Sequence, residues 1–415
     1  MSWRDSLFNI LQNCEKKRAD AVIYLVMFAM TSGLLFLSGF CKGALKFALI
    51  VIALTLPCLL AGFRDETIGT DILSYAKAQC EHAEKMSLTG FMVNESGTSA
   101  PLWNLMTWLS TRVTGGMAGY LFTIELFCLI PVYFACSRIM RGEEWYGVLL
   151  WLLLWYAFSL NGMRQSIAMS FVLLAVTFIF ERKPMPFCIL VGIGMLFHQT
   201  AVVAFFMYPL ALFLAYNNNT KSFTECSPLA FKVALILCAI LLLFVFGDYI
   251  VAALSRLKES YSYQLNHLGE RDISYAGLYM LFVICSVWCA AHKSFDIRID
   301  ATRHEPEKAE GFHKNSSNMS LVNIRFRFEF LCIASAAGCL LWQLNYIAAT
   351  LGRVGYYGCS LLVLLGEAVF CLKNRRTRFV SFVLLILAIV YFVGTTMILH
   401  GEGVYPYTSQ IMGII

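Results

Sequence analysis

Apolar runs recur along almost the whole chain, separated by short polar segments. Many of these runs approach the length that a helix needs to cross about 30 Å of hydrocarbon. No polar segment between them is long enough to bury a core of its own. The pattern predicts an all-α, polytopic integral membrane protein with about 11–13 transmembrane helices and short or re-entrant segments on the outer side. The expected spans cover residues 21–38, 47–61, 117–136, 145–160, 166–180, 187–215, 230–250, 273–291, 328–349, 354–371 and 379–398.

The first 20 residues alternate apolar and charged positions, which predicts an amphipathic segment on the membrane surface and no signal peptide. Residues 21–415 form one expected membrane domain, with a hydrophilic, cytoplasmic loop at 291–327. Lys and Arg also gather in three short segments, which the positive-inside rule places in the cytoplasm. These segments are 136–144, 181–184 and 373–378. The tail from His400 has neither Lys nor Arg and is expected outside.

The run at 187–215 lies between two segments that look cytoplasmic, so it must cross an even number of times. We expect a hairpin that turns near "FHQT" (197–200) and brings His198 to the outer face. Successive spans cross the membrane in opposite directions, so the segments between them alternate between the two sides. Counted in this way, the segments on the outer side are 62–71, 161–165, 254–272 and 351–357, provided that 101–116 lies at the interface without crossing. The basic residues of the N-terminus do not fit this scheme, because they would prefer the cytoplasm.

Composition supports the membrane assignment, because 59% of residues are hydrophobic and only 14% are charged. The fifteen cysteines lie mostly singly within apolar runs, which is typical of small buried hydrophobes rather than of a disulfide framework. The net charge is +6, and its Lys and Arg residues cluster in short loops. This distribution indicates the orientation of the chain in the membrane and gives no support to nucleic-acid binding.

Four ionisable residues on the expected outer side are candidates for function, because an ionised group near hydrocarbon needs a partner, a cavity or water. They are Arg64, Arg164, His198 and Arg353. Each also has a plain structural alternative: Arg64 could snorkel to lipid headgroups, His198 could be a hydrogen-bonded structural residue, and the glycines around Arg353 could serve helix packing.

Polar neighbours strengthen three of these candidates. The segment "GTD" follows Arg64 and offers a glycine, a hydroxyl and a carboxylate, although its Asp could simply cap the next helix. Amide side chains flank Arg164, and tyrosines follow Arg353. The neighbours are Gly69, Thr70, Asp71 and Tyr75 after Arg64, Asn161 and Gln165 beside Arg164, and Tyr356 after Arg353.

Four segments, in this order and spacing, resemble the EpsG family, relatives of the Wzy-type polymerases of O-antigen and exopolysaccharide synthesis. They are "FRDETIGTDILSY", "SLNGMRQSIAMSFVLLA", "LFHQTAVV" and "LGRVGYY". The resemblance implies a bacterial inner-membrane enzyme whose active site faces the periplasm. It would join polyprenyl-pyrophosphate-linked oligosaccharides, one as donor and one as acceptor, beside membrane lipid. A chain-length regulator and a flippase would be further partners.

The residue types suit this chemistry. The arginine fork binds phosphate oxygens with paired hydrogen bonds and can stabilise a leaving pyrophosphate. His198 could take the proton of the attacking hydroxyl or orient the sugar, and Asp71 is the rival base. Together with Arg164 they form the expected catalytic set, and the other outer residues are expected to bind substrate. We expect no metal and no cofactor.

Other classes stay open at this point. An O-antigen ligase would use the same residues with another acceptor. A metal-dependent transferase would need a close acidic pair on an early outer loop, which Asp65, Glu66 and Asp71 could provide. A non-enzymatic flippase of lipid-linked glycans would line a through-cavity from two repeated halves, and the sequence shows no internal repeat.

Overall fold

The computed structural model describes residues 22–98, 100–215, 273–304, 314–347, 349–366 and 375–414. Those residues are almost entirely helical and contain no β-strand, so the predicted all-α membrane class is confirmed. Contacts divide the chain into two compact units. The first combines Met1–Leu174, Ile189–Gln199 and Ala388–Ile415, and the second combines Ala175–Cys188 and Thr200–Leu387.

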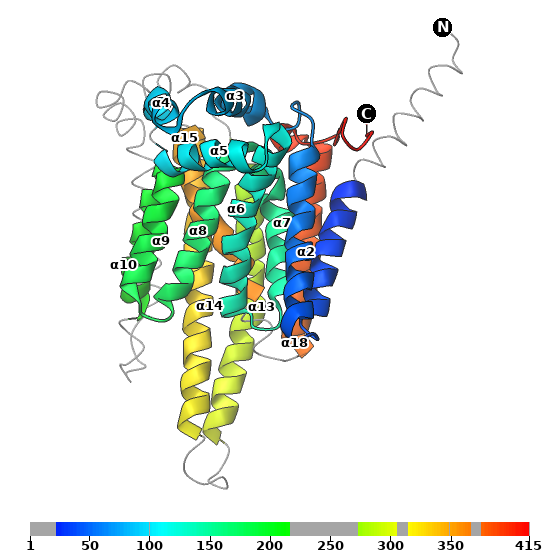
Figure 1. The fold of residues 1–415 in the computed structure, drawn as a ribbon. Coiled ribbons are helices and arrows are strands. Elements are labelled where there is room, and N and C mark those ends of the chain that lie inside the picture. Colours follow the sequence, from blue (N-terminus) through cyan, green and yellow to red (C-terminus); the bar gives the residue numbers. More distant parts are fainter. Residues whose placement is uncertain are drawn as a thin grey trace. The chain divides into compact units, whose positions relative to one another are not determined.

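The helices of the first unit come mainly from the N-terminal half of the chain (Figure 1). They are Val22–Ser38, α2 (Gly43–Phe63), η1 (Ile72–Ala76), α3 (Lys77–Lys85), α4 (Leu88–Asn94), η2 (Ser96–Thr98), α5 (Pro101–Val113), α6 (Gly116–Ile139), α7 (Glu144–Asn161), the first part of α8 (Met163–Ile179), the end of α9 (Pro184–Phe197), η8 (Val393–Ile398) and η9 (Gly401–Gly403). The second unit holds η3 (Gln199–Phe206), α10 (Met207–Ala215), α13 (Tyr275–His304), α14 (Lys314–Trp342), η5 (Gln343–Tyr346), α15 (Ala349–Gly352), η6 (Arg353–Gly355), α16 (Tyr356–Cys359), η7 (Ser360–Leu365) and most of α18 (Arg375–Phe392).

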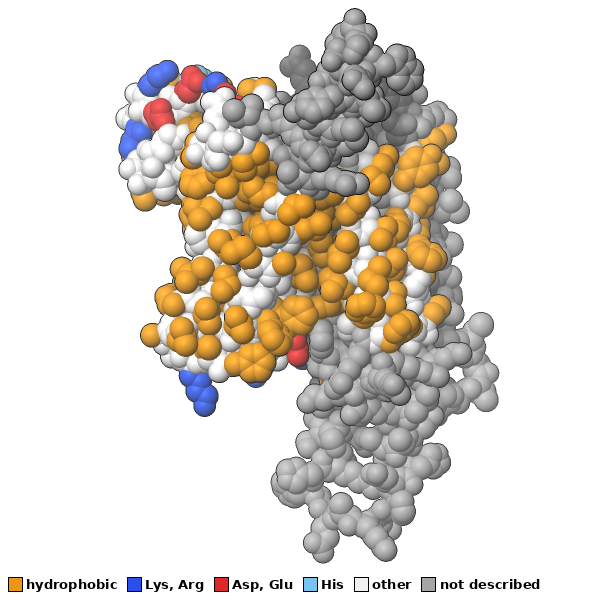
Figure 2. All heavy atoms as spheres, turned by 90° about the vertical axis from the view of Figure 1, so that its right-hand side faces the viewer, with side chains coloured by type: hydrophobic (Ala, Val, Ile, Leu, Met, Phe, Trp, Pro, Cys, Tyr) orange, Lys and Arg blue, Asp and Glu red, His pale blue; other side chains and the backbone are white. Residues whose placement is uncertain are grey.

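Three of the described helices are long and apolar enough to cross a membrane: α2, α6 and Phe379–Ile398. Shorter apolar helices occur at Val22–Ser38, Met163–Ile179, Pro184–Phe197, Gln199–Ala215, Tyr275–Ala291 and Arg353–Leu365. Hydrophobic side chains cover most of the described surface that Figure 2 shows, and charged side chains gather at its ends. The expected span at 230–250 lies outside the described residues.

Helix α7 forms the centre of the first unit. Its sequence is apolar on every side, which is the pattern of a helix surrounded by protein rather than by lipid on one face. Trp151, Trp155 and Tyr156 are buried within it, and the Tyr156 hydroxyl donates to the Pro57 carbonyl of α2 at 2.7 Å. This buried helix ends at Asn161, so its carboxyl end fixes the position of the residues around it.

Three short helices, α3, α4 and α5, pack together across the end of α6 (Figure 1). Helix α5 has 13 residues. At 1.5 Å per residue such a helix covers only about 20 Å, less than the hydrocarbon thickness. Helix α5 is not among the described helices that are long and apolar enough to cross, and the interfacial position expected for 101–116 stays a prediction.

The helix at 187–215 breaks where the hairpin was predicted to turn, and its two crossings stay a prediction. Helix α9 ends at Phe197, and the chain continues as η3 and α10. The ring of Phe187 lies 6.3 Å from that of Phe205 and 5.3 Å from that of Tyr208, so the start of α9 lies next to η3 and α10. The turn falls at His198, as the polar "HQT" indicated.

The expected loop at 291–327 is wrong in extent. Helix α13 continues through it to His304, and α14 begins at Lys314. Pro306 and Gly311 are the only Pro and Gly in the stretch, and both lie between these two helix ends. A drop in hydropathy marks where a helix leaves the hydrocarbon, whereas helix-breaking residues mark where it ends.

The glycines near Arg353 serve helix packing. A Cβ atom on Gly338 of α14 would lie 2.6 Å from the Cys359 nitrogen and 2.7 Å from the Gly355 carbonyl oxygen. Both neighbours are backbone atoms that cannot rotate away. Gly355 and Gly358 thus let the chain of η6 and α16 approach α14 directly.

We expect Gly338→Ala to destabilise the protein by about 1–3 kcal/mol, because the added methyl overpacks a contact between two backbones. Gly192→Ala in α9 is the matched control, since nothing lies within 4 Å of the place that its methyl group would occupy. Thermal unfolding in detergent compares the two. Equal melting temperatures for both variants would contradict this account of the packing.

Candidate functional site

The segment after α2 folds over the carboxyl end of α7. Arg64 leaves the helix in an extended conformation, and its Nη2 donates to the Leu160 carbonyl at 2.9 Å. Gly69 has φ +84°, a region that favours glycine, and a Cβ there would lie 2.6 Å from the Leu160 oxygen. Arg64 and Gly69 thus meet the same carbonyl, which the α7 helix leaves without an intrahelical donor.

Arg64 does not snorkel to lipid. It is only 6% exposed, and its side chain points into the protein, where Nη2 also lies 3.6 Å from the Met163 sulfur. Burial lowers the pKa of Arg64, and the nearby Tyr156 and Glu125 act in the opposite direction. Its Nε atom has no hydrogen-bond partner among the described residues. The structure therefore gives Arg64 a part in closing the end of α7, beneath the surface of the site.

The C-terminal tail holds the 64–71 segment from the other side. The Asp65 amide donates to the Thr408 carbonyl at 3.0 Å, and the Gly69 amide donates to the Gly403 carbonyl at 2.9 Å. The Gln410 amide donates to Asp65 Oδ1 at 2.8 Å. These bonds join parts of the chain that are more than 300 residues apart, and they fix the segment that carries Thr70 and Asp71.

Asn161 connects three elements at the end of α7. Its Oδ1 accepts from the Thr70 hydroxyl at 2.9 Å and from the Asp71 amide at 3.2 Å. Its Nδ2 donates to Glu402 Oε2 at 2.7 Å. Glu402 has φ +65°, a conformation that costs energy for a residue with a side chain. Because both ends of the Asn161 amide are engaged, Asn161 holds the 70–71 segment and Glu402 at the end of α7.

Arg164 is the second residue of α8 and rests on aromatic rings. Its Cζ is 4.0 Å from the centroid of Tyr75 and 5.5 Å from that of Trp103. The two rings meet edge to face with centroids 6.1 Å apart. No hydrogen bond or ion pair joins Arg164 to another residue in the part of the chain that the structure describes, and its Nε is buried without a partner there. Aromatic faces attract a guanidinium without neutralising it, so its charge stays available to an anion.

Asp71 lies at the start of η1 and makes no side-chain capping bond, which sets aside the N-cap alternative. Its Oδ2 instead accepts from the Tyr75 hydroxyl at 2.8 Å. Burial raises the pKa of Tyr75 well above its usual value, and the charge of Asp71 acts in the same direction. Tyr75 therefore stays protonated, donates to the carboxylate, and offers its ring face to Arg164.

The structure thus brings together seven of the predicted site residues in the first unit. They are Arg64, Gly69, Thr70, Asp71, Tyr75, Asn161 and Arg164. Gln165 follows Arg164 and is buried. The group offers one cation on an aromatic corner, one carboxylate nearby and a rigid backbone around them.

The other predicted residues are not joined to this group by a described contact. His198 is partly buried at the break between α9 and η3, and Phe197 beside it stacks on Phe171 of α8 at 5.8 Å. Arg353 is exposed and belongs to the second unit, as does Tyr356, whose ring lies 4.6 Å from that of Trp342. Their place in an active site stays a prediction.

A family comparison gives these observations a context. The chain matches the EpsG family model over residues 47–409. It belongs to the EpsG family. The family is of the Wzy-like polymerase type, so the resemblance seen in the sequence is confirmed. No curated protein and no solved structure gives a match. The matched range begins in α2 and ends at Ser409, so it includes every predicted site residue of this EpsG-family chain.

Sequence reasoning missed three residues that the structure places in contact with this group or with the elements that carry it. Glu125 is the one charged residue in the apolar run 117–136, and it is buried with Oε2 accepting from the Ser159 hydroxyl at 2.8 Å. A carboxyl inside a membrane helix was the available signal. Trp103 and Glu402 gave no comparable signal, because their roles arise from contacts with residues far away in the chain. No group of three or more His, Cys, Asp and Glu side chains suited to a metal ion occurs among the described residues.

We expect Gly69→Ala to lower the thermal stability of the protein, because the methyl meets the Leu160 carbonyl in addition to the strain of a positive φ. The strain costs about 1–2 kcal/mol and the clash about 1–3 kcal/mol more. Gly115→Ala is the matched control, since Gly115 has φ +66° and open space at its Cβ position. An equal loss in both variants would show that the close approach at Leu160 is absent.

Proposed function

We propose that this EpsG-family protein is a membrane glycosyltransferase that joins polyprenyl-pyrophosphate-linked oligosaccharide repeat units into a surface polysaccharide. It would act in the bacterial inner membrane, with its site toward the outer face and without a metal or cofactor. Family membership supports a polymerase role in exopolysaccharide synthesis. The observation that carries the proposal further is the guanidinium of Arg164, which two aromatic rings hold without a carboxylate partner among the described residues.

Arg164 would bind the pyrophosphate of the lipid-linked donor. Its planar fork can donate two parallel hydrogen bonds to phosphate oxygens, and it keeps its charge next to lipid. As the bond between the anomeric carbon and the pyrophosphate breaks, negative charge grows on the leaving oxygen. A cation already in place stabilises that charge without reorganising. Gln165 and Arg353 are proposed as further substrate-binding residues.

Asp71 would act as the base. In the transfer, a hydroxyl of the acceptor sugar attacks the anomeric carbon of the donor chain, a new glycosidic bond forms, and polyprenyl pyrophosphate leaves. The hydroxyl proton passes to the Asp71 carboxylate as the bond forms. The Tyr75 hydroxyl, 2.8 Å from Oδ2, would hold the carboxylate in place while it accepts the proton. His198 is the alternative base, and it would need to share a cavity with Arg164.

The ligase alternative differs only in the acceptor, and the acceptor assay separates the two enzymes. The first unit offers a specific observation against a flippase as the main role. Arg164 is fixed by Tyr75 and Trp103, and Asn161 ties the surrounding segments together. A rigid site of this kind suits chemistry on a bound diphosphate better than passage of a substrate.

We expect Arg164→Lys to lower the polymerisation rate at least about tenfold, because lysine keeps the charge but loses the paired hydrogen bonds, each of which contributes about 1.5 kcal/mol or more. The assay incubates purified protein in liposomes with lipid-linked repeat units and follows the ladder of products on a gel.

Arg112→Lys is the matched control. Arg112 also lies over an indole ring, 4.9 Å from the centroid of Trp108, but it is exposed and donates to the Met86 carbonyl at 2.8 Å. We expect this variant to polymerise at the wild-type rate. A normal ladder from Arg164→Lys, with both variants equally stable, would contradict the proposed role of Arg164.

A further inference from the structure

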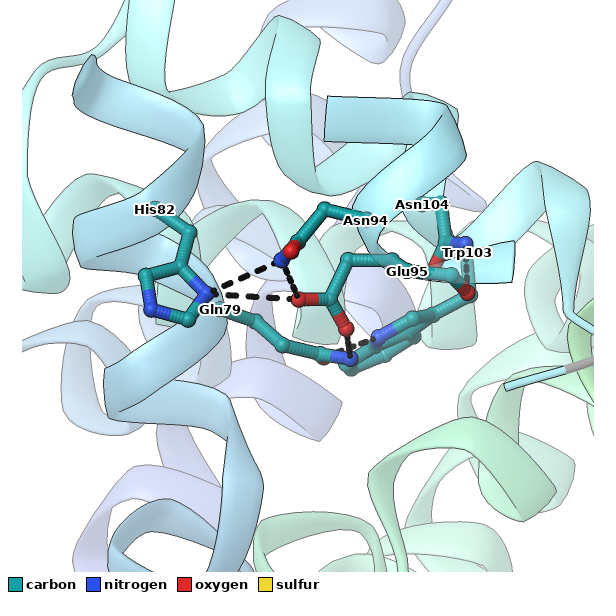
Figure 3. A network of polar contacts seen from close by, with 6 residues as sticks. All are labelled: Gln79, His82, Asn94, Glu95, Trp103 and Asn104. Carbon is teal, nitrogen blue, oxygen red and sulfur yellow. Dashed lines mark hydrogen bonds and ion pairs between the residues drawn. The ribbon is translucent and has the colours of Figure 1, made fainter. Parts of the chain in front are cut away.

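Beyond Arg164 and its two rings, a network of polar side chains connects α3, α4 and α5 (Figure 3). Glu95 lies at its centre. Glu95 Oε2 accepts from Gln79 Nε2 at 2.8 Å, and Gln79 Oε1 accepts from Trp103 Nε1 at 2.8 Å. Trp103 and Gln79 are 0% and 4% exposed. The network therefore reaches, through buried hydrogen bonds, the indole ring that faces Arg164.

The direction of each hydrogen bond in this chain is fixed. An ionised carboxylate can only accept, so the NH₂ end of Gln79 must face Glu95. The carbonyl end of Gln79 must then face the indole, whose N–H can only donate. Of the two orientations of the Gln79 amide, only this one satisfies both neighbours. Trp103 and Glu95 thus require the same orientation of the Gln79 amide, and Glu95 holds its NH₂ end in place.

Other contacts hold Glu95 itself. Asn94 Nδ2 donates to Glu95 Oε1 at 3.1 Å, and His82 Nδ1 lies 3.3 Å from the same oxygen. Asn104 Nδ2 donates to the Glu95 carbonyl at 3.1 Å. Glu95 is thus anchored from all three helices, and a shift of any of them would move it (Figure 3).

These contacts bear on the cation. Trp103 is packed between the network and Arg164, and Tyr75 completes the corner on which the guanidinium rests. An acceptor at the indole N–H polarises the ring and makes its face more negative, and the charge of Glu95 strengthens that acceptor through Gln79. A more negative face attracts the guanidinium more strongly.

We propose that Glu95 and Gln79 are positioning residues that act through Trp103 to hold Arg164 where it binds the diphosphate. This inference rests on the proposed function, since it assigns residues that support the same site. Neither residue touches the substrate in this scheme. Their loss should therefore matter only as long as an arginine is present at position 164.

A double-mutant cycle tests this dependence. Glu95→Gln keeps the size of the side chain and removes the charge, and Gln79→Leu removes the link to Trp103. We expect each to lower the polymerisation rate about tenfold in the wild-type background, equal to a loss of about 1.4 kcal/mol. In an Arg164→Lys background we expect each to lower it less than about twofold.

The controls distinguish a role that depends on Arg164 from a purely structural role and from failure of the proposed function. Trp108 lies on α5 like Trp103, and its indole N–H donates to the Met86 carbonyl at the end of α3. Trp108→Phe removes this N–H and should leave the rate unchanged in both backgrounds. An equal loss from Glu95→Gln in both backgrounds would show a purely structural role and overturn the inference, as would no loss in either. Where Gln79→Leu fails to fold, the Glu95→Gln cycle alone decides. Full activity of Arg164→Lys would instead overturn the proposed function.

Discussion

The contact of the Arg164 guanidinium with the face of Tyr75, 4.0 Å from the ring centroid, is the interaction on which the rest of the site depends. A carboxylate would hold the arginine equally well but would neutralise it. An aromatic face attracts the cation and leaves its N–H groups able to bind an anion. Asp71 serves this arrangement indirectly, because it binds the Tyr75 hydroxyl and so fixes the ring.

Arg64 and Arg164 show how two arginines near the same helix end can differ. Arg64 is buried and donates to the Leu160 carbonyl, while Arg164 rests on rings at the start of the next helix. The first closes the backbone at the end of α7, and the second presents charge. Asn161 lies between them and ties the segment at 70–71 to Glu402 of the C-terminal tail. The rigidity of the corner comes from these polar contacts together with the buried α7 helix.

Sequence patterns predicted the helices and the hairpin turn at His198, because hydropathy and short polar breaks are local signals. Hydropathy misjudged residues 291–327, where the helices run on toward Pro306 and Gly311. The motif "GTD" and the neighbours of Arg164 also pointed to residues that the structure brings together, and their role in a site stays a prediction. The partners of Arg164 could not be read in this way, since Tyr75 and Trp103 come from other elements and meet it only through tertiary packing. The network around Glu95 is equally invisible in the sequence, because its members follow no common spacing.

Binding of an isoprenoid diphosphate tests the central claim most directly. Calorimetric titration of the purified protein with farnesyl diphosphate, and with farnesol as the uncharged reference, measures the contribution of the anion. If Arg164 binds the diphosphate, Arg164→Gln should weaken binding of farnesyl diphosphate at least about tenfold and leave binding of farnesol unchanged. Equal affinity of wild type and Arg164→Gln for the diphosphate would contradict the account.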